Sequence, residues 1–166
     1  FSHEDMFLYD YPQTEILNKY ITAIKNNKYD FIKLIKGGNC IYHKSEIDDS
    51  LFELDNKKSN WIFSIQPSIW HIDSFVKLLK KRQKLNIWEF EEKIQKTCKK
   101  LKIRGAFSFG EGKKRGIHHF DNNIYPYIAT AIVKGKWSIE EYPDILPKLL
   151  KEHNIDPKIR GEFKLK

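Results

Sequence analysis

Residues 77–104 carry the positive surplus of the whole chain. Eleven lysines and arginines there stand against three glutamates, and the difference equals the formal net charge of +8 of all 166 residues. Charge concentrated in one segment creates a strong local field, for which a polyanion is the natural partner. The charge pattern therefore favours DNA or RNA as the partner. The cationic residues are Lys77, Lys80, Lys81, Arg82, Lys84, Lys93, Lys96, Lys99, Lys100, Lys102 and Arg104.

A second basic cluster follows between two glycines. Residues 112–116 read Gly-Lys-Lys-Arg-Gly, and such a loop can approach a phosphate backbone or enter a groove. The alternative is that these charges only keep a turn and a helix end solvated. As the contact set we predict Lys77, Lys80, Lys81, Arg82, Lys84, Lys113, Lys114 and Arg115.

Two tryptophans stand next to the basic segment. Trp70 precedes it and Trp88 lies within it, so either indole could stack on an unpaired or flipped base. The alternative is that both rings pack in the core, as most large aromatic side chains do. For Trp61, on an expected strand, we favour the core.

The pair His118-His119, close to Asp121, offers different chemistry. Histidine can act as a general acid or base near neutral pH, and neighbouring cations can stabilise a charged phosphoryl transition state. A small metal-independent ribonuclease, similar to a toxin, is therefore an alternative hypothesis. The other histidines show no spacing of metal ligands, and residues 105–112 lack both nucleotide-binding glycine motifs, so we expect no metal and no cofactor.

The helices and strands that we expect from the sequence indicate an α+β fold. Helical periodicity indicates helices near residues 73–84 and 89–102, and the aromatic and β-branched run at 61–65 predicts a strand. We expect a curved mixed or antiparallel sheet, or a partial β-barrel, flanked by helices. A single domain would span residues 1–166, with a helical part near 12–36, a β-rich core with helices near 39–137, and a C-terminal helix and tail near 138–166.

Parts of residues 60–135 resemble modules of the PUA superfamily. Asn60-Trp61-Ile62-Phe63, then Trp70-His71-Ile72-Asp73, Asn86-Ile87-Trp88 and Arg115-Gly116-Ile117, are similar to the opening strand, helix entry, second tryptophan and later strand of EVE and YTH-type modules. The resemblance implies a small β-barrel with an aromatic pocket for a modified base, lined by Trp88 and Trp70.

The composition also bears on where the protein is located. Two distant cysteines argue against a secreted disulfide scaffold, and no apolar run is long enough to cross a membrane, so we expect a cytoplasmic protein. The first residue is not Met, and we expect fusion or partnership with other domains.

The leading hypothesis is a nucleic-acid-binding module, in one form the DNA target-recognition domain of a restriction or defence protein. A protein-interaction or immunity-type domain is a further alternative.

Overall fold

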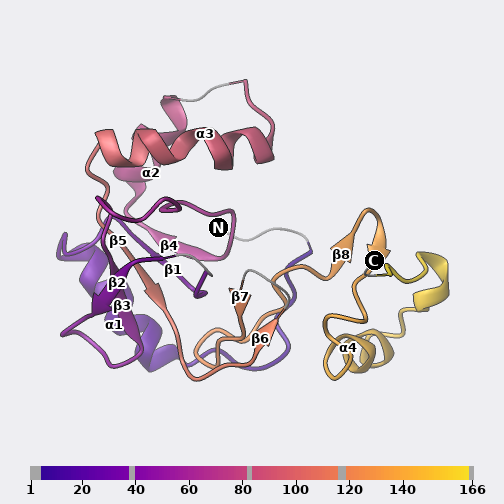
Figure 1. Ribbon diagram of the computed structural model, residues 1–166. Helices are drawn as coiled ribbons and strands as arrows, with labels where there is room; N and C mark the ends of the chain where they lie inside the picture. Colours follow the sequence, from indigo (N-terminus) through magenta and orange to yellow (C-terminus); the bar gives the residue numbers. More distant parts are fainter. Residues whose placement is uncertain (1–4, 38–39, 82–83, 116–118, 165–166) are drawn as a thin grey trace.

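A five-stranded mixed sheet lies at the centre of the fold (Figure 1). The computed structural model describes residues 5–37, 40–81, 84–115 and 119–164. The strand order is β2-β3-β5-β1-β4, in which β1 and β5 run parallel and the other neighbouring pairs run antiparallel. The strands are β1 (Phe31–Lys33), β2 (Tyr42–Lys44), β3 (Leu51–Leu54), β4 (Ser68–Trp70) and β5 (Gly105–Ser108).

Helices cover both faces of this sheet. α1 (Thr14–Lys25) packs on one face, and α2 (Ile72–Lys80) with α3 (Ile87–Lys100) packs on the other. Successive side chains of a strand point to opposite faces, so Phe31 and Ile32 of β1 enter different cores. The core under α2 and α3 includes Phe31, Leu54, Ile62, Phe63, Leu78, Ile94, Cys98 and Phe107; that under α1 includes Tyr20, Ala23, Ile24, Ile32, Leu51 and Ala106.

The chain ends in a smaller unit with its own core, here called the C-terminal lobe (residues 128–164). Its core combines Ile128, Ala131, Trp137, Tyr142, Leu146 and Leu150 with side chains of the N-terminal segment. The backbone N–H of Ile128 donates to the carbonyl of Phe7 at 2.8 Å, which ties that segment to the lobe. The elements from residue 114 on are β6 (Lys114–Arg115), β7 (His119–Phe120), β8 (Ile132–Val133), β9 (Lys136–Trp137), α4 (Leu146–Glu152) and a 3-10 turn (Pro157–Ile159).

The predicted α+β class is confirmed. The sheet is mixed and stays open, so it does not close into the barrel considered from the sequence. None of the helices in the described ranges combines the length and the apolar character needed to cross a membrane.

The strand predicted at residues 61–65 is wrong, because this segment pairs with a side chain instead of a strand. Oε1 of buried Gln95 accepts the backbone N–H groups of Ile62 and Phe63 at 2.7 and 3.0 Å. Its Nε2 donates to the carbonyl oxygens of Phe63 and Glu91, at 2.8 and 2.7 Å. Gln95 thus takes the place of a neighbouring strand and fastens the segment to α3.

We expect Gln95→Leu to lower the free energy of unfolding by about 2–4 kcal/mol, because it leaves buried backbone groups without partners. Urea denaturation followed by circular dichroism measures this. Lys96→Gln, at the exposed next position, should change stability by less than about 0.5 kcal/mol. A Gln95→Leu variant as stable as the wild type would contradict the bracing role of the amide.

Gly105 makes room for an aromatic ring at the middle of the sheet. It lies opposite Phe31 in the parallel β1–β5 pair, and a Cβ built on it would meet the Phe31 ring at 2.3 Å. The Phe31 ring in turn stacks on Trp70, with centroids 4.7 Å apart. The absent side chain therefore allows the aromatic row that supports α2 and α3.

We expect Gly105→Ala to destabilise the protein by about 1–3 kcal/mol through overpacking. Phe31→Leu in the same chain should recover part of this loss, because the two changes act on one contact. Gly37→Ala is the matched control, since within the described part of the chain its Cβ would meet only the Cys40 sulfur, at 3.8 Å. Thermal unfolding of the wild type, the two single variants Gly105→Ala and Phe31→Leu, and the double variant measures the coupling, and strictly additive losses would contradict it.

Candidate nucleic-acid interface

The α2–α3 hairpin (residues 72–100) orients the basic segment. Leu78 of α2, and Ile94 and Cys98 of α3, are buried against the sheet. A capping box starts α3: the Asn86 side chain accepts from the N–H of Glu89 at 2.9 Å, and the Glu89 carboxylate accepts from the N–H of Asn86 at 3.2 Å. The apolar side chains fix the inner faces of α2 and α3 against the sheet. The lysines of both helices must therefore lie on the outer faces.

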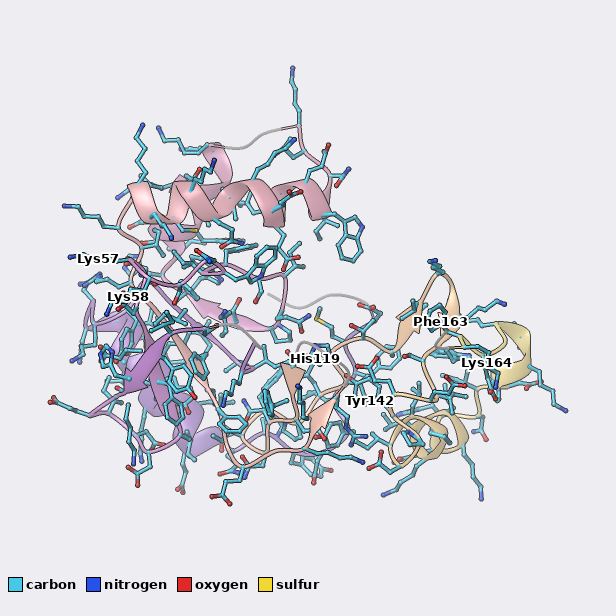
Figure 2. The ribbon with its side chains drawn as sticks, in the orientation of Figure 1. Lys57, Lys58, His119, Tyr142, Phe163 and Lys164 are labelled. Atoms are coloured by element: carbon cyan, nitrogen blue, oxygen red, sulfur yellow. The ribbon has the colours of Figure 1, made fainter. Side chains whose placement is uncertain are left out.

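The described lysines of residues 77–102 are all exposed. Figure 2 shows long side chains with nitrogen tips extending from the hairpin away from the sheet. Lys93 approaches Glu89 at 3.8 Å, and Lys99 donates to the carbonyl of Lys57 at 3.4 Å. The other lysines make no ion pair with a carboxylate in the described part of the chain. These lysines are Lys77, Lys80, Lys81, Lys84, Lys96, Lys100 and Lys102. Arg82, also in the predicted contact set, lies outside the described residues.

Arg104, at the end of the basic segment, is already engaged. Its Nε pairs with Asp30 at 3.1 Å, and its backbone N–H donates to the same carboxylate at 2.8 Å. Lys57 lies near the C-terminal end of α3, whereas Lys58, labelled beside it in Figure 2, pairs with Asp55 at 3.6 Å. Both lysines lie in a turn far away in the sequence, and the Lys99 ammonium group donates to the carbonyl of Lys57.

The structure corrects the assignment of Arg115 to nucleic-acid binding. Its side chain is only 4% exposed and lies between two carboxylates. Nη1 and Nη2 donate to the oxygens of Asp144 at 2.8 and 3.1 Å, and Nε donates to Asp121 at 2.9 Å. The two anions neutralise the guanidinium, so Arg115 joins the β6–β7 hairpin to the C-terminal lobe and offers nothing to a phosphate.

Lys113 and Lys114 of the same loop are exposed, but they do not extend the patch on α2 and α3. Figure 1 shows β6 and β7 well apart from α2 and α3. Any phosphate contact made by this loop would therefore be separate from that of the α2–α3 hairpin.

The two tryptophans predicted to meet a base have different positions. Trp70 packs among Phe31, Phe63 and Phe75, with ring centroids 4.7, 5.8 and 5.0 Å away, and its Nε1 donates to Ser68 at 2.9 Å. These aromatic neighbours favour the core alternative for Trp70, whose side chain is partly buried. Trp88 is 75% exposed and stays a candidate. Trp61, expected in the core, is 40% exposed.

His119 lies in a crowded and anionic setting. Its Nε2 is 3.3 Å from the Tyr142 hydroxyl and 3.5 Å from a Glu141 oxygen, and Figure 2 shows His119 and Tyr142 side by side. The hydrogen bond with His119 lowers the pKa of the Glu141 carboxyl. Asp121 and Asp144 already pair with Arg115, and the Glu141 carboxylate lies against His119 itself. This negative charge disfavours a phosphodiester at the histidine. His118 lies outside the described residues.

Lys36 is a feature that the sequence did not single out. Its Nζ lies 4.4 Å from the ring centroid of Phe109, 4.8 Å from that of Phe120 and 5.4 Å from that of Tyr42. Attraction between the cation and the ring faces joins three segments that are remote in the sequence. No local pattern could have predicted it, because each ring comes from a different strand or loop.

No group of three or more His, Cys, Asp and Glu residues within the described ranges is arranged to hold a metal ion. Comparisons with known protein families, curated proteins and solved structures find no match to this chain. Its function is therefore inferred from the geometry of its own residues.

The Arg115–Asp144 pair predicts a pH dependence of stability. Hydrogen bonds from Arg115 lower the pKa of Asp144 from 3.8 to about 2. Since the folded carboxyl holds its proton less tightly than the unfolded one, its contribution is complete above about pH 4 and is lost as the pH falls toward 2. Asp144→Asn should therefore be less stable than the wild type at pH 6, and the two should converge near pH 2.

Urea midpoints of both proteins at a series of pH values test this. Asp49→Asn, at a fully exposed carboxylate, should give a curve close to that of the wild type. A difference between wild type and Asp144→Asn that is the same at every pH would mean that the pair does not act through charge.

Proposed function

We propose that this chain is a nucleic-acid-binding module whose contact surface is the outer face of the α2–α3 hairpin. One observation carries the proposal: six exposed lysines of residues 72–100 have no carboxylate partner among the described residues. Surface cations of this kind are usually distributed among acidic residues, which here occur mainly elsewhere in the chain.

The chemistry of a polyanion fits this surface. Each lysine that neutralises a phosphate releases condensed counterions, so affinity arises without base contacts and falls steeply with salt. The hairpin is held by buried side chains and by Gln95, and its lysines therefore share one rigid support. Lys57, beside Lys99, would extend the contact at the C-terminal end of α3.

The proposal also includes a more specific role and a cellular location. A role as the DNA target-recognition domain of a restriction or defence protein would use the phosphate contacts of this surface. Location in the cytoplasm is in keeping with the free thiols of Cys40 and Cys98.

The salt dependence of oligonucleotide binding tests the proposal. Fluorescence anisotropy with a labelled oligonucleotide at several salt concentrations gives the slope of log K against log salt. For the triple variant Lys77→Ala, Lys80→Ala, Lys81→Ala, we expect this slope to become shallower by about 2–3, because three phosphate contacts are lost.

A matched triple variant in the C-terminal lobe is the control. Lys136→Ala, Lys148→Ala, Lys151→Ala removes the same charge from exposed positions that lie off the hairpin. It should leave the slope nearly unchanged. Equal slopes for both triple variants would show that net charge, and not this surface, governs binding.

A further inference from the structure

Exposed apolar side chains lie among the lysines of the α2–α3 hairpin. Ile72 is 66% exposed, Val76 36%, Leu79 42% and Trp88 75%. Ile72, Val76 and Leu79 follow one another at intervals of four and three, so they form a stripe along α2. Leu78 is buried toward the sheet, which shows that α2 carries apolar side chains on its outer side as well as its inner side.

This apolar stripe distinguishes between two kinds of polyanion. A duplex presents phosphates on its outside and keeps its bases stacked in pairs, so an indole and a row of aliphatic side chains would gain little from it. A single strand exposes the flat apolar faces of its bases between its phosphates. On the hairpin, lysines alternate with exposed apolar side chains. This order matches the phosphates and bases that alternate along a single strand.

We propose that the hairpin binds single-stranded nucleic acid, with a base stacked on Trp88 and neighbouring bases against the α2 stripe. This inference rests on the proposed function and adds the substrate class to it. Lys77, Lys80 and Lys81, from the same helix as the stripe, contact the phosphates. Trp88 is in the second position of α3, directly after the loop that follows α2.

The proposed complex divides the binding energy between two kinds of contact. The lysines supply a term that depends on salt and is common to all polyanions. Trp88 supplies a term that depends little on salt and needs an unpaired base. The two terms can be removed separately, because Trp88 is exposed and its truncation leaves the core intact.

Binding of a labelled mixed-sequence single strand and of its duplex, at matched salt, tests the inference. We expect the wild type to bind the single strand at least about tenfold more tightly. Trp88→Ala should lose roughly tenfold in affinity for the single strand, keep its salt slope and bind the duplex as before. Trp88→Phe should retain most of the affinity. Tyr11→Ala is the control for an exposed aromatic off the hairpin, since Tyr11 is 92% exposed.

Each other outcome contradicts the inference in a recognisable way. If duplex and single strand bind equally and only the lysine variant weakens them, the proposed function stands and the single-strand preference is wrong. If neither oligonucleotide binds, both are wrong. Binding of polyglutamate that requires Trp88, without oligonucleotide binding, would mean that the stripe meets an acidic protein segment.

Discussion

Burial of the inner face of the α2–α3 hairpin determines where the charge of this protein lies. Leu78, Ile94 and Cys98 are packed against the aromatic side of the sheet, and helical geometry then leaves only the opposite faces for the lysines. Without that packing, the same residues would form a flexible basic segment whose field spreads in all directions. The rigid support concentrates the cations on one side of the sheet and makes them a surface.

The sheet can hold the hairpin because both of its faces are covered. β1 sends Phe31 toward α2 and α3 and Ile32 toward α1, and Gly105 on β5 leaves space for the Phe31 ring. The same arrangement buries Lys33 completely, and burial lowers the pKa of its ammonium group. A buried lysine on an interior strand such as β1 is costly, so the rest of this core must be well packed to retain it.

Local patterns in the sequence predicted the features that depend on residues close together in the chain. The periodicity of Ile94 and Cys98 and the excess of lysine indicated a basic helix, and α3 confirms it within about two residues. Long-range partners could not be predicted in this way. The segment 61–65 has the composition of a strand, yet it pairs with Gln95. Arg115 belongs to a basic loop, yet Asp144, far along the chain, neutralises it.

Lysine footprinting tests the central claim most directly. Reactive labelling of amines, read by mass spectrometry with and without a bound oligonucleotide, reports on every exposed lysine in one experiment. The account predicts protection of Lys77, Lys80, Lys81 and Lys96 and unchanged labelling of Lys136, Lys148 and Lys151. Protection that is uniform over the molecule, or strongest in the C-terminal lobe, would contradict it.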